Sequence, residues 1–291
     1  MRWLCPNCHS LIDPVSLTCA DGHRFAVEDG VLVLLADDFG RDLHAFLASF
    51  QLLRAVGDKR LLDLAAYEHL PAVRSDLGDA QIQLEWRLRR YDLAIVLERL
   101  RDRVRQAILD IGAWNGWLSH QLAKRDHDVT AIDYFVDKYD GLGARQFYST
   151  HWRAIQMDLV DLSVLDGCFD VIIVNRCLQF FTDPIAYVAG LRQKLSAGGM
   201  LIITGLQFFD DSSRKAREVA EMLSAHRRRY GFNLFLRPSK GYLDAHDRRD
   251  LQALGVGLQG YPQLWRANLK AVIKRTRPHH AYGVYRAERR A

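Results

Sequence analysis

The chain has 291 residues, of which 49% are hydrophobic, and its formal net charge is +5 at pH 7. This length and composition predict a globular protein with a substantial core, organised as one full domain and a small appendage. No apolar run is long enough to cross a bilayer and the first residues resemble no signal peptide, so we expect a cytoplasmic protein without a membrane span. The charge is uneven: residues 212–291 hold 18 Lys and Arg against 6 Asp and Glu, a net +12 that leaves −7 for the rest. This basic quarter is either a set of solvated helix faces or a surface for an anionic partner, nucleic acid included.

Residues 1–36 predict a zinc-binding domain. Two close pairs, Cys5-x2-Cys8 and Cys19-x3-His23, supply four sulfur and nitrogen ligands suited to a tetrahedral ion, Zn²⁺. A segment this small has little core of its own, so the metal would supply much of its folding free energy. His9 is a competing ligand, but an exposed surface role is favoured for it.

Residues 37–105 are helical in character and form a linker or cap. From Gln81 to Leu100 the apolar residues recur at helical spacing, on a stripe made of Ile82, Trp86, Leu93, Leu97 and Leu100. Pro71 and Gly78 mark a break that divides the predicted helices into two groups.

The segment Ala107–Asp133 organises the rest of the chain. An apolar strand over 107–111 is followed by a glycine turn, a helix from Trp117 and a second strand over 128–133. Gly112 and Gly116 permit a close ligand approach and leave N–H groups free at the helix start. Asp133 closes the second strand 21 residues after Gly112, where such folds keep the acid that binds ribose hydroxyls. We therefore expect a nucleoside ligand.

Asp110 discriminates between the possible nucleosides. An ionised carboxylate two residues before Gly112 would repel the pyrophosphate of a dinucleotide, whereas it can accept a hydrogen bond from the ammonium of an amino acid. S-adenosyl-L-methionine carries such an ammonium together with a ribose.

The stretch resembles motifs I and II of the class I S-adenosylmethionine-dependent methyltransferases, with Trp114 in place of the middle glycine. The resemblance implies an α/β, Rossmann-like fold with a seven-stranded sheet and helices on both faces, over residues 106–291, with a basic insertion at about 212–280 and a small N-terminal zinc ribbon. Trp114 could narrow the cofactor site, and Tyr67 and Trp86 are lid candidates in this family, although core packing is favoured for both. The residues that the resemblance assigns to the cofactor are Asp110, Gly112, Ala113, Trp114, Gly116, Asp133, Tyr134, Asp158, Leu159 and Asn175.

Further strands and helices alternate in the order of this family. Strands are expected at 153–157, 169–175 and 201–204, with a helix from Asp183-Pro184 to about Leu195 and a turn at SAGGM before the last of these strands. Gly141 and Gly143 interrupt any helix before Ala144. The resemblance covers 107–205 and gives Asp158 the role of binding the adenine amino group; a helix cap is the alternative.

The C-terminal quarter begins with a helix over 213–229 that ends in a basic run. A loop over 230–242 is placed to close over substrate, and the last strands are expected near 256–261 and 281–287. Between them, residues 265–277 mix aromatic and basic side chains, a composition that can bind RNA.

Methyl transfer needs alignment of the acceptor and management of a proton, and few side chains are strictly required. In this family the loop after the fourth strand faces the methyl group, so Asn175, Arg176 and Gln179 are the acceptor-side candidates. Glutamine is not a general base near neutral pH, so either His151 takes the proton or the acceptor is already nucleophilic. Cys177 is expected to be a buried structural thiol rather than a nucleophile.

Three functions remain open from the sequence. The first is a methyltransferase acting on a small-molecule, glycan or lipid intermediate. The second is an RNA methyltransferase, because the N-terminal segment resembles the zinc finger of ribosomal RNA guanine-N1 methyltransferases, as well as Trm112-type small zinc domains, and the C-terminal quarter is basic. The third is a non-catalytic cofactor-binding or scaffold protein. Neither the methyl acceptor nor the oligomeric state follows from the sequence.

Overall fold

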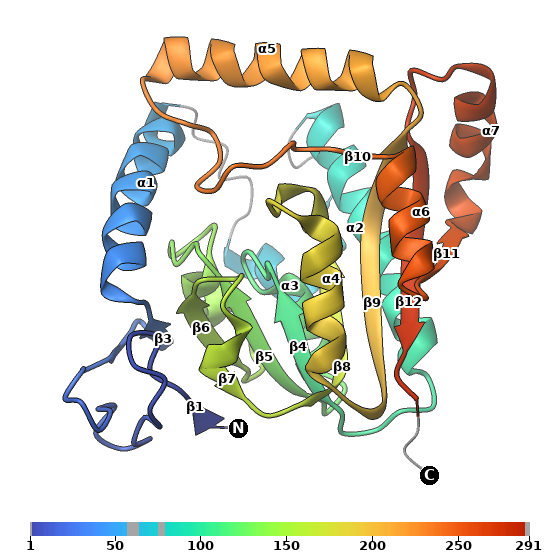
Figure 1. Cartoon of the computed structure of the whole chain (residues 1–291). Coiled ribbons are helices and arrows are strands. Elements are labelled where there is room, and N and C mark those ends of the chain that lie inside the picture. The colour runs from blue at the N-terminus through green and yellow to red at the C-terminus, as the bar shows by residue number, and fades with distance from the viewer. Residues whose placement is uncertain (1, 57–63, 75–78, 289–291) are drawn as a thin grey trace. The chain divides into compact units, whose positions relative to one another are not determined.

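The computed structural model describes residues 2–56, 64–74 and 79–288, which form two compact units, 1–169 and 170–291. Helices and strands alternate in both units, so each has a mixed α/β, Rossmann-like construction (Figure 1). The units are described separately below.

Unit 1 begins with three short strands, β1 (Arg2–Trp3), β2 (Ala26–Glu28) and β3 (Val31–Leu34). β2 and β3 form a hairpin whose turn, Asp29-Gly30, has two positive φ angles of 48° and 78°, as a tight two-residue hairpin requires. β3 is buried and pairs in parallel with a strand of the main sheet, β6, while β1 pairs antiparallel with β7. The resemblance implied a seven-stranded sheet with a separate zinc ribbon, but the apolar run Val31–Leu34 instead adds β3, and through it β2, to the sheet of unit 1.

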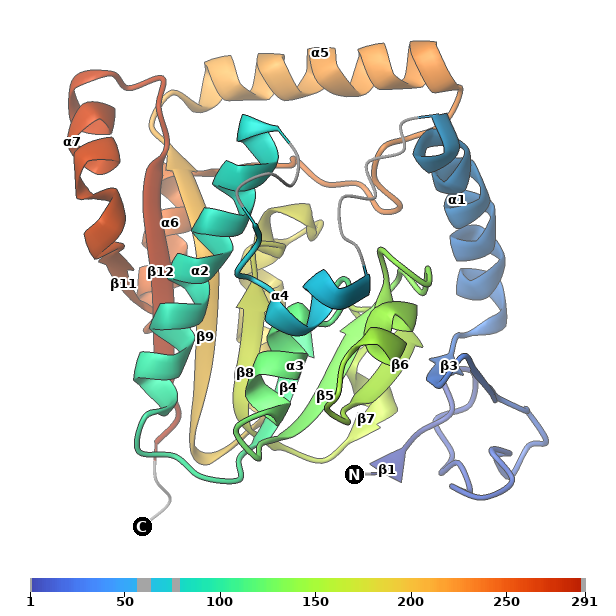
Figure 2. The same cartoon turned by 180° about the vertical axis from the view of Figure 1, so that it is seen from behind.

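Helices α1 (Asp37–Val56), η1 (Leu64–His69) and α2 (Ala80–Leu100) follow (Figure 2). Pro71 lies between the two groups as expected, whereas Gly78 lies outside the described residues. Asp79 caps α2 by accepting a hydrogen bond from the N–H of Ile82.

The buried face of α2 differs from the predicted stripe. Trp86 and Leu100 are buried, but Ile82, Leu93 and Leu97 are half-buried. Asp92, Ile95 and Val96 are buried in their place. The apolar spacing predicted the helix correctly but not the face that is buried. The buried face includes a polar residue, Asp92, which a search for apolar spacing does not detect.

The rest of unit 1 is a parallel sheet in the order β4–β5–β6–β3. Its elements are β4 (Ala107–Ile111), α3 (Trp117–Ala123), β5 (Asp128–Asp133), η2 (Leu142–Phe147), β6 (Arg153–Met157), η3 (Leu162–Val164) and β7 (Leu165–Asp166). The predicted strand bounds are confirmed. η2, however, starts at Leu142 and contains Gly143, which was expected to interrupt a helix.

Unit 2 has the strand order β8–β9–β12–β11, with β10 beside β9. Its elements are β8 (Phe169–Asn175), η4 (Leu178–Phe180), α4 (Pro184–Gln193), β9 (Leu195–Phe209), α5 (Ser212–Tyr230), β10 (Leu243–Asp244), α6 (Ala245–Ala253), β11 (Gly257–Gly260), η5 (Pro262–Leu264), α7 (Trp265–Ile273) and β12 (His279–Arg286). β12, the last strand, lies antiparallel between β9 and β11.

The expected turn at SAGGM is wrong, because β9 begins at Leu195 and runs through it. The end of the chain holds this segment extended: Gly198 donates its N–H to the Glu288 carbonyl, and Ala287 donates to the Gly199 carbonyl. On α5, Val219 is buried and Ala220 is exposed. None of the described helices combines the length and apolarity that crossing a bilayer would need.

Candidate functional site

The glycine turn after β4 is built for close packing. Gly112 and Gly116 have φ angles of 66° and 77°, in the left-handed region that favours glycine. A Cβ at Gly116 would lie 2.3 Å from the side chain of Trp152, so no larger residue fits there without a rearrangement. The expectation of free N–H groups here is wrong for the two glycines, because Gly112 donates its N–H to the Ile132 carbonyl and Gly116 donates to the Ala113 carbonyl.

Asp110 lies on β4 just before this turn and is fully buried. Its Oδ2 accepts a hydrogen bond of 2.7 Å from the Ser119 hydroxyl, whereas its Oδ1 is buried without a hydrogen-bond partner among the described residues. Burial raises the pKa of Asp110 to about 7, and the Asp133 carboxylate acts in the same direction against the Ser119 hydrogen bond. The sequence analysis expected a fully ionised carboxylate; at neutral pH this one is ionised only in part, and a cation at Oδ1 would restore its charge.

Asp133, at the end of β5, ties the turn to the loop that follows the strand. Its Oδ2 accepts from the Trp114 N–H at 2.7 Å and its Oδ1 accepts from the Phe135 N–H at 2.9 Å. Ala113 donates its N–H to the Ile132 carbonyl on the same strand. The acid that the sequence placed at the ribose is thus fixed beside the glycine turn.

Trp114 adopts a left-handed conformation, with φ 53°, and its indole has several partners. The ring stacks on Trp86 with centroids 5.6 Å apart, the Arg89 guanidinium lies 4.8 Å from its centroid, and Nε1 donates to Asp140. Trp86 is itself buried, as is Tyr67, whose hydroxyl donates to the Tyr139 carbonyl. These contacts agree with the favoured core role for Trp86 and Tyr67; narrowing of a cofactor site by the indole stays a hypothesis.

The structure also brings together Tyr134 and Asp158. The Tyr134 hydroxyl donates to Asp158 Oδ1 at 3.2 Å, and the same oxygen accepts from the Val160 N–H. Leu159 is buried next to them. Asp158 therefore forms a local turn after β6 as well as standing where the adenine contact was predicted. Of the ten expected cofactor residues, Asn175 alone belongs to unit 2.

In unit 2, Asn175 and Arg176 join the end of β8 to β9. Asn175 donates its side-chain amide to Thr204 Oγ1 at 2.6 Å, and the Arg176 N–H donates to the Thr204 carbonyl. Gly205 leaves room for the Arg176 side chain, since a Cβ there would lie 2.4 Å from its Cγ. Cys177, expected to be buried, is half-buried.

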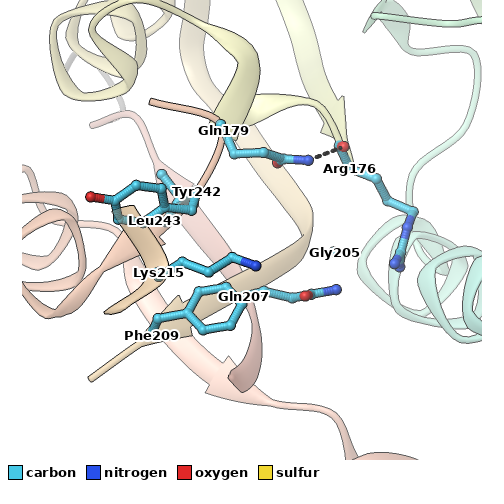
Figure 3. Close-up of a pocket in the computed structure, with 9 residues that line it drawn as sticks. Arg176, Gln179, Gly205, Gln207, Phe209, Lys215, Tyr242 and Leu243 are labelled. Carbon is cyan, nitrogen blue, oxygen red and sulfur yellow. Dashed lines mark hydrogen bonds between the residues drawn. The ribbon is translucent and has the colours of Figure 1, made fainter. Parts of the chain in front are cut away.

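Arg176 and Gln179 line a cavity of about 160 Å³ in unit 2. Its other lining residues come from β9, α5 and the segment that enters β10, and they are Gly205, Gln207, Phe209, Lys215, Gly241, Tyr242 and Leu243. Figure 3 shows the Lys215 amino group and the Gln207 amide extending toward the middle of this group, while Gln179 donates to the Arg176 carbonyl. The lining is thus cationic, amide and aromatic, without a carboxylate or imidazole among these residues.

The loop 230–242 reaches the cavity through Gly241 and Tyr242, and its closure over a substrate stays a prediction. Its end is fixed by two ion pairs of Lys240, 2.6 Å to Asp247 and 3.2 Å to Asp244, and by a hydrogen bond from Ser239 to the Gln179 carbonyl. Sequence reasoning missed Gln207 and Phe209, because the strand was expected to end at Thr204, and it gave no site role to Lys215 on the helix that follows. His151, the candidate base, is exposed in unit 1, in the loop before β6.

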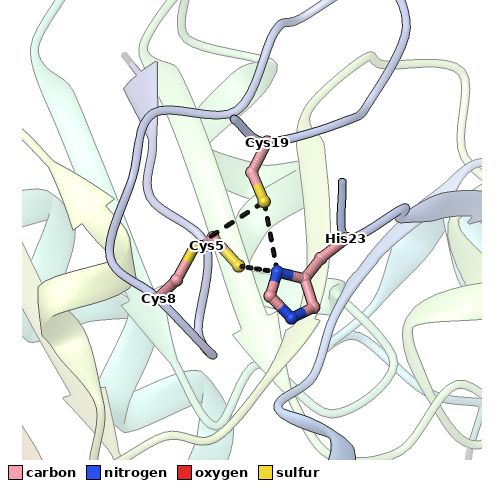
Figure 4. Close-up of side chains that lie close together, drawn as sticks. All are labelled: Cys5, Cys8, Cys19 and His23. Carbon is pink, nitrogen blue, oxygen red and sulfur yellow. Dashed lines mark hydrogen bonds between the residues drawn. The ribbon is translucent and has the colours of Figure 1, made fainter. Parts of the chain in front are cut away.

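The four predicted metal ligands converge in unit 1 (Figure 4). The ligand atoms of Cys5, Cys8, Cys19 and His23 all lie within 4.8 Å of one another. Two tight turns bring them together: His9 donates its N–H to the Cys5 carbonyl, and Gly22 donates to the Cys19 carbonyl. The His9 side chain is exposed, in agreement with the role favoured for it.

This order of elements is typical of Rossmann-like domains that bind nucleosides. It consists of a strand, a glycine turn, a helix and a second strand that ends in an acid. Residues 109–203 match the family model described as "Methyltransferase domain". This segment of the chain is therefore similar to methyltransferase domains.

Similar curated proteins have methyltransferase names. A malonyl-[acyl-carrier protein] O-methyltransferase of Xylella fastidiosa is 35% identical over 108 residues, which are 36% of this chain and 37% of that protein. A ubiquinone biosynthesis O-methyltransferase of Psychrobacter cryohalolentis is 27% identical over 101 residues, 33% of this chain and 39% of that protein. The chain thus spans less than half the length of these curated relatives.

Among solved structures, the magnesium protoporphyrin IX methyltransferase of Synechocystis PCC 6803 with bound SAH is similar at 14% identity. The alignment covers 82% of this chain and 97% of that one, with a TM-score of 0.49.

Proposed function

We propose that the protein is an S-adenosylmethionine-dependent methyltransferase that acts on a small-molecule or lipid-linked acceptor. The observation that carries the proposal is the buried Oδ1 of Asp110 beside the glycine turn, which has no hydrogen-bond partner in the described part of the chain, in a segment that matches a methyltransferase domain. A buried carboxylate oxygen without a donor is costly and gains most from a charged donor such as an ammonium.

The residues of unit 1 fit an amino-acid nucleoside. In the proposal Asp110 accepts a hydrogen bond from the ammonium, and Asp133 accepts from the ribose hydroxyls. Tyr134, Asp158 and Leu159 flank the base. The bound nucleoside supplies a methyl group on a sulfonium, and the chain orients it and excludes water.

We further propose that the acceptor carries a carboxylate. The unit 2 cavity offers the Lys215 amino group and the Gln207 amide as donors, and its lining contains no group that would take a proton at neutral pH. A carboxylate needs no base, because it is already ionised. Under this proposal the acceptor is nucleophilic by itself, which is one of the two alternatives left open by Gln179, and the malonyl group named for one relative supports it.

Calorimetry with S-adenosylmethionine tests the first proposal. Asp110→Asn keeps the size of the side chain and removes its charge. We expect the affinity for S-adenosylmethionine to fall about 10- to 100-fold, because a hydrogen bond to a charged group contributes about that much to binding. Asp128→Asn is the matched control, because Asp128 lies on β5 as an exposed partner of Arg153. An absence of binding heat for the unaltered protein would refute the proposal and favour a scaffold role.

Mass spectrometry completes the test. Incubation with the cofactor and candidate carboxylic acids is expected to give a methylated product that disappears on Asp133→Ala. Circular dichroism must show that this variant is folded, since Asp133 also holds the turn at Trp114.

We also propose a structural zinc ion at Cys5, Cys8, Cys19 and His23. Its support is the mutual approach of four ligand atoms of the right chemistry. None of the five cysteines forms a disulfide, and a cytoplasmic, reducing location, which we infer for the protein, would keep them reduced and able to bind a metal. Elemental analysis of the purified protein is expected to give one zinc per chain.

A further inference from the structure

Helix α7 presents an apolar face that is exposed. Trp265, Leu269, Val272 and Ile273 are exposed by 57%, 55%, 67% and 76%. With successive residues about 100° apart around a helix, these four positions fall within an arc of about 100°. Exposed large apolar side chains are common singly, but four on one face mark an interaction surface.

The opposite face of α7 is fixed to unit 2, so the exposed face has a defined direction. Ala271 is fully buried. The Asn268 side chain donates to the His280 carbonyl at 2.9 Å and accepts from the His280 N–H at 2.7 Å, which binds the helix to β12. Figure 1 shows α7 beside β11 and β12.

Basic residues flank the apolar face. Arg266, Lys270 and Lys274 are exposed and fall in the arc next to it, and Arg275 and Arg277 follow the helix. Residues 265–277 contain no Asp or Glu. A short helix with Trp and aliphatic residues on one face and only cations beside it is the pattern of a helix that lies in the surface of an anionic membrane.

The composition of the face separates a membrane from RNA. RNA binding needs cations for phosphates and aromatic rings for bases, and here only Trp265 is aromatic. Leu269, Val272 and Ile273 contribute nothing to RNA binding, but all three gain from transfer into the acyl region of a bilayer.

We propose that α7 is an interfacial helix by which the protein binds the surface of anionic lipid bilayers. Its apolar arc enters the boundary between headgroups and acyl chains, and its Lys and Arg residues contact lipid phosphates. This binding is independent of the methyltransferase activity proposed above.

Flotation of the full chain with vesicles tests the inference. The protein is expected to float with phosphatidylcholine vesicles that contain phosphatidylglycerol, weakly with phosphatidylcholine alone, and less as salt is raised. The pair Val272→Gln and Ile273→Gln should lower the partition coefficient at least about tenfold. The pair Lys270→Gln and Lys274→Gln should reduce binding to the anionic vesicles and weaken its dependence on salt, because Arg266, Arg275 and Arg277 remain.

Matched controls use exposed residues elsewhere. Val104→Gln, at a side chain exposed by 80% in unit 1, and the pair Arg227→Gln and Arg228→Gln on α5 should leave vesicle binding unchanged. Equal losses in these controls would contradict a specific role for α7. Thermal unfolding of each variant shows whether it is folded.

Three other results would overturn the inference. The first is no flotation of the unaltered protein. The second is binding of poly(U) that Lys270→Gln and Lys274→Gln abolish while vesicles are not bound, which would assign the helix to RNA. The third is a dimer, seen by sedimentation, together with no binding to vesicles. In that case the pair Val272→Gln and Ile273→Gln would dissociate the dimer.

Discussion

The two units place opposite charges at their candidate sites. In unit 1, Asp110 on β4 and Asp133 on β5 are buried carboxylates beside a glycine turn, and Oδ1 of Asp110 has no hydrogen-bond partner among the described residues. In unit 2, Arg176 follows β8 and Lys215 lies on α5, and the described residues that line their cavity include no acid. Both units use the same α/β construction, so the side chains placed on it, and not the fold, decide which charge a site receives.

The first way to test this contrast is to remove the metal proposed for unit 1. Chelation, or Cys5→Ser, should unfold residues 2–25 locally, because a zinc site in isolated peptides supplies of order 10 kcal/mol. Hydrogen exchange should show loss of protection in this segment, with α4 still protected. Cys168→Ser, at an exposed cysteine, is the control. Unchanged protection after complete chelation would contradict a structural zinc ion.

The second test concerns the pKa of Asp110, which is about 7 in the folded chain against an ordinary value of 3.8. Below about pH 4 the carboxyl is neutral in both folded and unfolded chains. As the pH rises to about 7 the unfolded chain ionises freely while the folded chain retains the proton, so the free energy of unfolding should fall by about 4 kcal/mol.

Urea unfolding over this pH range measures the effect. Asp110→Asn should remove the decline, whereas Asp128→Asn should preserve it because Asp128 is exposed. A decline that persists in Asp110→Asn would place its origin in another group. Added S-adenosylmethionine should also weaken the decline, since an ammonium at Oδ1 stabilises the charged form.

The third test removes a cation from the unit 2 cavity and measures the KM for the acceptor and the affinity for the cofactor separately. Lys215→Gln should raise the KM for the acceptor about tenfold, because the acceptor carboxylate loses a hydrogen bond to a charged donor. The affinity for the cofactor should be unchanged. Arg217→Gln, exposed on the same helix, should change neither. Should Lys215→Gln lower kcat with no change in KM, the carboxylate-binding role of the unit 2 cavity would be wrong.

The smallest effect is expected from Trp114→Gly. The variant loses the stacking on Trp86 and the hydrogen bond to Asp140 but relieves a positive φ, so we expect a net destabilisation of about 1 kcal/mol. Denaturant unfolding measures this change, and calorimetry should show an unchanged cofactor affinity. A marked gain in affinity would instead mean that the indole narrows the site.

Local signals account for most of what sequence reasoning predicted correctly. The strands at 107–111, 128–133, 153–157 and 169–175, the helix start at Asp183-Pro184 and the convergence of the four metal ligands all follow from short-range spacing. Such signals are encoded within a few residues and survive in any tertiary context.

Long-range pairing accounts for the errors. β9 extends through SAGGM because residues 287 and 288 pair with it, and β3 joins the sheet because β6 offers an edge. Neither partner is near in sequence, so no local pattern signals the pairing. The inward face of α2 was misplaced for the same reason.

The sequence by itself determined which residues carry the chemistry: an acid and two glycines at one turn, an acid closing the next strand, and three cysteines with a histidine. Only the tertiary structure decided how these and other residues behave. It buried Asp110 until its pKa rose, gathered Lys215 and Gln207 around a cavity, and left four apolar residues of α7 uncovered. Ionisation and exposure depend on what packs against a side chain, and that neighbour usually comes from a distant part of the chain.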